Sequence, residues 1–415
     1  MLAPHTPVPR VGDFGIVRHS NSAMLLPPVT SETHAPKLIQ SALFAGFIIT
    51  GMTCTILGPI LPVFIARWNL TDAQAGLFFT TQFGGSLLGV GLSSILLSTR
   101  GFRDALMLGF LLMAAGVAGL NGASHDAALF ATAAYGFGFG VAIPATNLCV
   151  AEISGVRRAA ALNLLNMAWG LGAIICPLLM LAGLKSDRFT QALFAIAAAA
   201  LLLGILFFLL KFEKTSRRPN SSSEPRSRQI TVHPIHVPIV LALLFYFYVG
   251  TENGISGWAA EQARRIGVGA SSTIVPMFFW TGLLSGRAIA AIILARVEEN
   301  LLVISGLILS ALGTICLLLA TTTPGIIFGV ALAGVGLAGI YPIFISWLSK
   351  WYGPGARRLG GVMFSLAAIG GATVPWIVGF VSQRSNSLRV GLLVPLVGSI
   401  VMIILVFALR RRIAA

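Results

Sequence analysis

The chain has 415 residues, of which 56% are hydrophobic and only 10% are charged, and its mean hydropathy is +0.89. Soluble domains average about 25% charged residues, so the composition excludes an ordinary soluble protein. A helix that crosses a bilayer needs about 20 apolar residues. Unbroken apolar runs such as 192–210 lack the alternation of membrane β-strands. We therefore predict an all-α integral membrane protein.

Twelve apolar runs are long enough to be transmembrane helices. Their approximate bounds are 38–66, 73–97, 104–122, 127–150, 159–183, 190–210, 237–263, 271–295, 300–320, 324–349, 359–382 and 389–410. An even number places both termini on one side of the membrane, and most of the 28 lysines and arginines lie in the tails and loops on that side. The positive-inside rule then predicts cytoplasmic termini in the inner or plasma membrane. This topology and anionic lipid explain the net charge of +15, so no nucleic-acid partner is expected.

A polar stretch rich in serine and proline separates six predicted helices from six. The predicted divisions are a disordered cytoplasmic tail at 1–37, an N-terminal six-helix bundle at 38–210, a cytoplasmic linker at 211–236, a C-terminal six-helix bundle at 237–410 and a cytoplasmic tail at 411–415. Within the first tail, Met24 is an alternative start to Met1.

Short motifs recur in the same helix of each predicted half, about 200 positions apart. The matching segments are 78–81 and 278–281, 136–144 and 334–342, and 157–170 and 357–370. They indicate a duplication of two parallel six-helix units. Such pseudo-repeats are typical of transporters that bind substrate at the membrane midplane, between two halves that rock against each other.

Two segments carry a family resemblance. Residues 248–258, YVGTENGISGW, are similar to the Y-V-G-x-E-x-G-x-x-x-W segment of a sugar permease branch, and residues 161–172, ALNLLNMAWGLG, are similar to its A-L-N-L-x-x-x-x-x-G-x-G segment. The Gly58-Pro59 and Leu61-Pro62 pairs also fit. From about residue 38 onwards the chain resembles the major facilitator superfamily, and within it the fucose/proton symporters and related glucose and galactose permeases. The resemblance implies alternating access with a hexose as the substrate.

Two acids of the proton-coupled fucose permeases have no counterpart in this sequence. The stretch before Pro59 is Thr53-Cys54-Thr55, and the predicted fourth helix has no acid until Glu152. The superfamily loop signature G-x-x-x-D-R-x-G-R is reduced to Arg100-Gly101-Phe102-Arg103. Coupling by the fucose-permease route is therefore not expected, and the coupling ion, a proton or sodium, is left open.

Glu252 is the acidic residue that lies deepest in an apolar run, and it shares one helical face with Tyr248 and Ser256. Ionisable groups inside a membrane are costly and mark functional sites. We predict that Glu252 binds sugar hydroxyls and takes a coupling sodium ion or proton. The alternative is a structural carboxylate paired with Arg287. Arg287 is itself predicted as a second coupling residue, with a snorkelling or structural side chain as its alternative.

Amides and aromatic rings complete the predicted substrate site, because amides both donate and accept hydrogen bonds and rings stack on sugar C–H groups. The predicted substrate-binding residues are Glu252, Asn163, Asn166, Gln82, Asn147, Trp258, Trp280 and Tyr248. Asn163 and Asn166 share a stripe with Gly170. The alternatives are hydrogen bonds between helices for the amides and packing against lipid for the tryptophans.

An intramembrane enzyme would need groups that this sequence does not place in its helices. All six histidines lie outside the predicted helical cores, and the four cysteines lack C-x-x-C spacing. We expect no enzyme activity, no metal site and no cofactor apart from a coupling ion. The predicted function is a monomeric secondary transporter that moves a hexose-like sugar by alternating access. The alternative is an efflux carrier of amphipathic drugs or lipids on the same fold.

Overall fold

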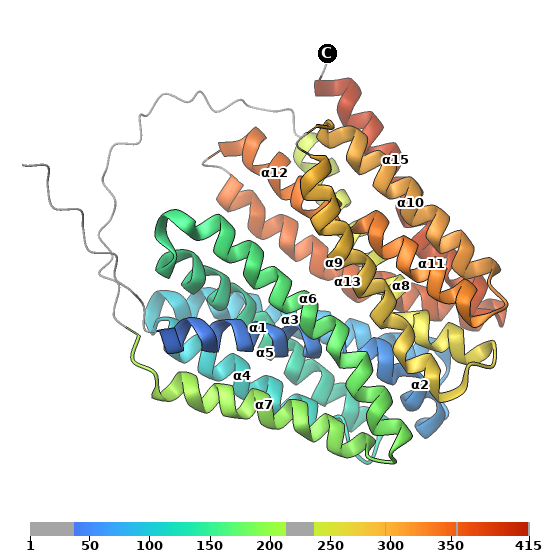
Figure 1. Cartoon of the computed structure of the whole chain (residues 1–415), viewed down its shortest axis with the longest axis horizontal. Coiled ribbons are helices and arrows are strands. Elements are labelled where there is room, and N and C mark those ends of the chain that lie inside the picture. Colours follow the sequence, from blue (N-terminus) through green and yellow to red (C-terminus); the bar gives the residue numbers. More distant parts are fainter. Residues whose placement is uncertain (1–36, 213–235, 295, 354–355, 414–415) are drawn as a thin grey trace, which may run out of the picture. The chain divides into compact units, whose positions relative to one another are not determined.

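The computed structural model describes residues 37–212, 236–294, 296–353 and 356–413, and these residues are almost entirely helical (Figure 1). The predicted tail at 1–37 lies outside the described residues except for Lys37. The predicted linker at 211–236 also lies outside them, except for its first two residues and its last.

Within the described ranges, 12 helical segments are long and apolar enough to cross a membrane. In chain order their elements are α1 (Lys37–Thr55) with α2 (Leu57–Trp68), α3 (Asp72–Thr99), α4 (Phe102–Gly119), α5 (His125–Ile153), η1 (Gly155–Arg157) with α6 (Arg158–Lys185), α7 (Phe189–Leu209), α8 (His236–Arg265), η2 (Gly269–Ile274) with α9 (Val275–Ile293), α10 (Glu299–Leu319), α11 (Thr323–Leu337) with α12 (Ile340–Tyr352), α13 (Ala356–Ser385), and α14 (Leu388–Gly391) with α15 (Leu393–Ile413). The predicted all-α architecture with twelve membrane helices is confirmed.

Figure 1 shows α1 to α7 gathered in one group, here called the first half, and α8 to α15 in another, the second half. The helix pairs repeat between the halves: α3 packs on α5 as α9 packs on α11. A Cβ atom added to Gly136 would lie 2.2 Å from the Gln82 carbonyl oxygen, and one added to Gly334 would lie 2.2 Å from that of Phe279. The repeated glycines therefore allow the same close helix crossing in each half.

Two membrane spans are interrupted near a proline. Proline removes one helical N–H, and its ring crowds the carbonyl four residues earlier. Accordingly, α1 ends at Thr55, four residues before Pro59, and α11 ends at Leu337, five residues before Pro342. Both prolines are visible in the sequence, yet the breaks were not predicted. Each break leaves carbonyl groups without a partner in their own helix, inside the membrane region.

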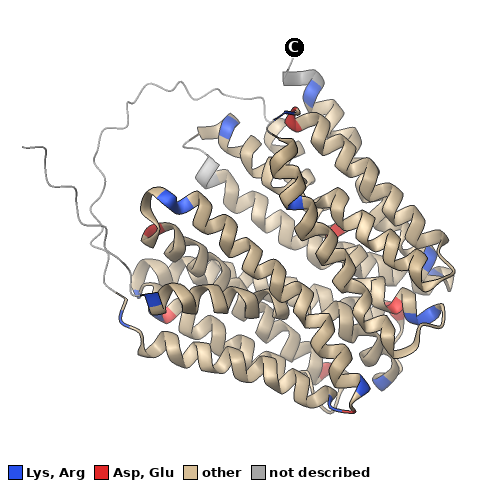
Figure 2. Ribbon diagram, viewed as in Figure 1, with Lys and Arg blue, Asp and Glu red and all other residues tan. Residues whose placement is uncertain are grey.

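Successive spans run in opposite directions, so the molecule has two ends. We call the end where α1 begins and α15 ends the terminal end, and the opposite end, where α2 and α8 end, the far end. Figure 2 shows the lysines and arginines mostly near the ends of the helices, as expected for a chain that crosses a bilayer.

Candidate functional site

At the far end the two halves are in direct backbone contact through α3 and α13. The Thr80 hydroxyl donates a hydrogen bond to the Ala372 carbonyl at 2.8 Å. A Cβ atom added to Gly379 would lie 2.2 Å from the Asp72 carbonyl oxygen. The pairs α2 with α8 and α6 with α9 also join the halves. The helices can approach this closely only because glycine has no side chain at the crossing.

Four charged residues, here called the far-end ion cluster, lock the same end. The Asp72 carboxylate of α3 accepts hydrogen bonds from the Arg265 guanidinium of α8, with Nη1 at 3.1 Å, and from the Ser382 hydroxyl. Arg265 Nε also donates to Glu261 at 2.8 Å, and Arg264 donates to Glu261 at 2.7 and 2.8 Å. The Glu261 side chain is completely buried. This cluster was not predicted from the sequence, although the spacing of Glu261 from the two arginines favours ion pairs on one helix.

Toward the terminal end these contacts are lost. Gly361 lies five helical turns from Gly379 on the same face of α13, yet a Cβ atom at Gly361 would meet nothing within 4 Å. On α6, an added Cβ atom at Gly170 would lie 3.0 Å from Leu284 of the other half. Asn163 and Asn166 continue that stripe and are exposed. The interface between the halves is therefore sealed at the far end and open toward the terminal end.

The Glu252 cluster, made of Tyr248, Glu252, Arg287 and Tyr341, lies between these two regions. Glu252 is half-buried on α8 and interacts electrostatically with Arg287 of α9 and with Tyr248. Tyr341 of α12 interacts with both charged groups. Cys54 of the first half lies within electrostatic range of Glu252, so the carboxylate is close to the interface between the halves. The structure thus brings together three residues that the sequence analysis selected: Tyr248, Glu252 and Arg287.

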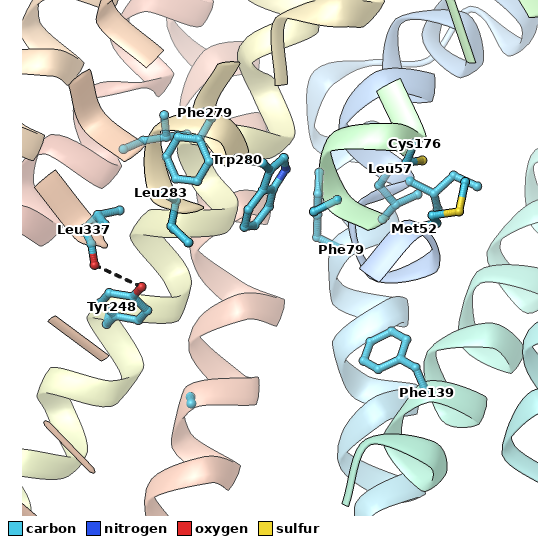
Figure 3. Close-up of a cluster of buried hydrophobic side chains, with 14 of the residues drawn as sticks. Met52, Leu57, Phe79, Phe139, Cys176, Tyr248, Phe279, Trp280, Leu283 and Leu337 are labelled. Carbon is cyan, nitrogen blue, oxygen red and sulfur yellow. Dashed lines mark hydrogen bonds between the residues drawn. The ribbon is translucent and has the colours of Figure 1, made fainter. Parts of the chain in front are cut away.

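The cluster offers both acceptors and donors to a ligand. The Tyr248 hydroxyl donates to the Leu337 carbonyl at 3.3 Å, one of the carbonyls freed where α11 breaks (Figure 3). Its ring packs on Tyr341, with ring centroids 5.4 Å apart. Arg287 Nε is buried and has no hydrogen-bond partner among the described residues. Because an unpaired buried donor is costly, Arg287 is suited to bind an oxygen atom of a ligand.

The two predicted stacking tryptophans are both buried. Trp280 is 3% exposed and meets Trp169 of the first half edge to face, with ring centroids 5.4 Å apart. Figure 3 shows it directed toward the side of the first half that carries Phe79. Trp258 is fully buried and donates a hydrogen bond to the Pro375 carbonyl at 2.9 Å. In this state Trp280 joins the halves and Trp258 supports the second half, and their stacking on substrate stays a prediction.

The predicted amides differ in burial: Gln82 is buried and bonds to other helices, whereas the asparagines are half-buried or exposed. Gln82 is buried and uses both ends of its amide within the first half, accepting from Tyr135 at 2.7 Å and donating to the Cys54 carbonyl at 3.0 Å. Asn147 is half-buried and Asn166 is exposed, and each donates to its own helix at 2.9 Å. Asn163 and Asn166 are thus the amides best placed for a ligand in the open part of the interface.

The described residues contain no group of three or more histidine, cysteine or acidic side chains that could hold a metal ion. All four cysteines are free, and Cys149 and Cys176 are buried. Any cation at the Glu252 cluster would therefore have a single carboxylate and neutral oxygen atoms as ligands.

Comparison with known proteins covers most of the chain. The sequence profile of the Major Facilitator Superfamily matches residues 43–350. A Helicobacter pylori (strain J99) protein named "Putative glucose/galactose transporter" is 26% identical over 397 residues, which span 88% of this chain and 93% of that protein.

Solved structures share the fold. A bacterial homologue of the human lysosomal transporter Spinster, in an inward-facing and occupied conformation, has a TM-score of 0.74 at 16% identity and covers 91% of this chain and 97% of its own. The transporter FucP in its outward conformation has a TM-score of 0.60 at 19% identity and covers 90% of this chain and 98% of its own.

Proposed function

Because the chain belongs to the major facilitator superfamily, we propose that it is a secondary transporter that carries a hexose-like sugar by alternating access. The observation that carries the proposal is the position of the Glu252 cluster, between the halves and at the inner edge of the sealed region. The named substrates of the Helicobacter pylori relative, glucose and galactose, support a hexose.

A neutral sugar fits the chemistry of the cluster. Sugar hydroxyls donate to a carboxylate and accept from a guanidinium, so Glu252 and Arg287 together would bind two neighbouring hydroxyls. Asn163 and Asn166 would add amide contacts from the first half. We assign Trp280 to the sugar ring, since it lies at the junction of the halves and would become accessible when they move.

Glu252 is our candidate for ion coupling. Its carboxylate interacts with Arg287 in the structure. A proton or a sodium ion bound to Glu252 would weaken that interaction and free the guanidinium for a sugar oxygen. Ion and sugar would then favour each other's binding, as symport requires.

We place the terminal end in the cytoplasm of a cell whose plasma or inner membrane holds the protein. Most lysines and arginines lie in the tails and loops on this side, which supports the assignment. The structure would then be the inward-open state, sealed on the outside by the far-end ion cluster. One copy contains both halves of the interface, so a monomer suffices for transport.

The proposal is tested by uptake into vesicles that contain the purified protein. Radiolabelled glucose, galactose and fucose are offered under an imposed sodium or proton gradient, for the native protein, for Glu252→Gln and for Glu152→Gln. Glu152 is an exposed acid at the end of α5 and serves as the matched control. We expect the native protein and Glu152→Gln to accumulate sugar, and Glu252→Gln to retain only downhill exchange.

Two results would contradict the proposal in different ways. Gradient-driven accumulation by Glu252→Gln at the native level would refute its coupling role and leave it a structural or substrate-binding carboxylate. Absence of flux for all three sugars in correctly folded protein would refute the sugar transporter. Transport of amphipathic drugs or lipids by the same vesicles would then support the efflux carrier.

A further inference from the structure

A second site lies in the second half, at the terminal end and away from the Glu252 cluster. A cavity of about 330 Å³ opens there between α10, α12 and α15. Its lining residues are Glu299, Asn300, Trp347, Lys350, Trp351, Leu409 and Arg410. All of them lie at the first turn of α10 or in the last turns of α12 and α15, so the cavity is at the depth where a membrane span meets the lipid headgroups.

Hydrogen bonds to one carboxylate fix the polar wall of this cavity. Glu299 accepts from Trp347 Nε1 at 2.9 Å, from Lys350 Nζ at 3.0 Å and from the Ser346 hydroxyl at 3.3 Å. The Trp347 and Trp351 rings stack with centroids 5.4 Å apart. Because these groups hold one another in place, the wall is organised before any ligand arrives, which lowers the cost of binding.

The charge of the cavity favours an anion. Lys350 and Arg410 carry two positive charges against the single negative charge of Glu299. The Lys350 side chain is 61% exposed, so its ammonium group remains accessible while it bonds to Glu299. In the sequence, Arg410 is followed by Arg411 and Arg412, which add positive charge to the same chain end.

The apolar part of the cavity distinguishes a lipid from a small soluble anion. Two tryptophans and Leu409 line it beside the basic residues. Tryptophan is enriched where a protein meets the membrane interface, and basic cavities between membrane helices hold anionic headgroups. Trp347 and Leu409 are each 3% exposed and form the floor of the cavity, whereas a free phosphate would use only the two cations and would leave the partly exposed Trp351 ring uncovered.

We propose that this cavity binds the headgroup of an anionic phospholipid from the leaflet at the terminal end. The phosphodiester would be held by Lys350 and Arg410, and the glycerol and the start of the acyl chains would lie against the partly exposed Trp351 ring. A bound lipid would link the three helices that form the cavity. The proposal is independent of the transported substrate.

The test is native mass spectrometry of the purified full-length protein, titrated with phosphatidylglycerol or phosphatidylcholine. The double variant Lys350→Gln, Arg410→Gln is compared with the native protein and with Arg157→Gln, Arg158→Gln. The control arginines are exposed at the same end but lie outside the cavity. Each basic residue near anionic lipid contributes about a fivefold factor, so we expect phosphatidylglycerol to bind the cavity variant roughly 25-fold more weakly. The control should bind as the native protein does.

Two further measurements, with two outcomes of the lipid titration, make the test decisive. Glycerol phosphate at millimolar concentration should not displace the lipid, and full displacement would show a small-anion site and overturn the proposal. Equal binding of phosphatidylcholine and phosphatidylglycerol to the native protein would also overturn it, as would an unchanged affinity in the cavity variant. The variant Lys350→Arg, which keeps the charge, should keep the affinity and thereby separates loss of binding from loss of folding.

Discussion

The two ends of the interface between the halves differ sharply, although the same helices form both. At the far end α3 and α13 touch backbone to backbone at Gly379, and Arg265 links Asp72 to the buried Glu261. Toward the terminal end the same face of α13 carries Gly361, which has no neighbour within 4 Å of an added Cβ atom. One helix, α13, therefore has a glycine at the close crossing with α3 and another, on the same face, where no neighbouring helix is near.

The charged side chains of the far-end ion cluster suit an interface that must open again. Its four charges sum to zero, so the paired ions offset much of the cost of excluding water. When the far end opens, water can hydrate these groups, whereas an extended apolar contact would be exposed at a large cost. We infer that the far end is built for reversible closure and that the Glu252 cluster, about 20 Å from Arg265 along α8, is reached from whichever end is open.

The largest effect is expected from filling the sealed crossing. Gly379→Val would place methyl groups against the Asp72 backbone, and overpacking of this kind costs about 1 to 3 kcal/mol. The far end should then fail to close, and sugar uptake should fall by roughly a factor of ten or more. Gly361→Val on the same face is the matched control and should transport normally. Equal loss in both variants would mean that the two ends do not differ as described.

A smaller effect is expected from Arg265→Gln, which removes the ion pair between Arg265 and Asp72 across the halves but leaves Arg264 paired with Glu261. Arg265 is 30% exposed, so solvent screening limits the loss to the order of 1 kcal/mol. The readout is oxidative cross-linking of Ala73→Cys with Gln383→Cys, in a background without the native cysteines.

This pair reports on closure because the Ala73 amide donates to Gln383 across the halves at 3.3 Å. Cross-linking should slow in Arg265→Gln and stay unchanged in Arg264→Gln, whose partner is on its own helix. Faster or unaltered cross-linking in Arg265→Gln would exclude a sealing role for the ion cluster.

The smallest effect concerns the inner edge of the seal, where Trp169 meets Trp280. A double-mutant cycle with Trp169→Leu and Trp280→Leu, followed by thermal unfolding, should give a coupling of about 0.5 to 1.5 kcal/mol. A ligand that separates the halves should reduce that coupling. Strictly additive effects would show that the aromatic contact contributes nothing to closure.

The family, the number of spans and their approximate ends could be predicted from the sequence, because hydropathy over about 20 residues is a local property. Glu252 could be selected for the same reason, since a carboxylate inside an apolar run is conspicuous wherever the helix packs. Its interaction with Tyr248 follows from helical spacing, and that with Arg287 was named as one alternative. By contrast, Gln82 and Trp258 fit the pattern of binding residues, yet the structure places both in packing contacts.

The sequence by itself thus determined a membrane protein of twelve helices, its internal duplication and Glu252 as the conspicuous carboxylate within an apolar run. Only the tertiary structure decided which end of the interface is closed. The seal depends on contacts such as Asp72 with Arg265, 193 positions apart, and Asp72 with Ser382, 310 positions apart. No pattern within a single helix specifies such pairs, because their distance is set by how the two halves are placed against each other.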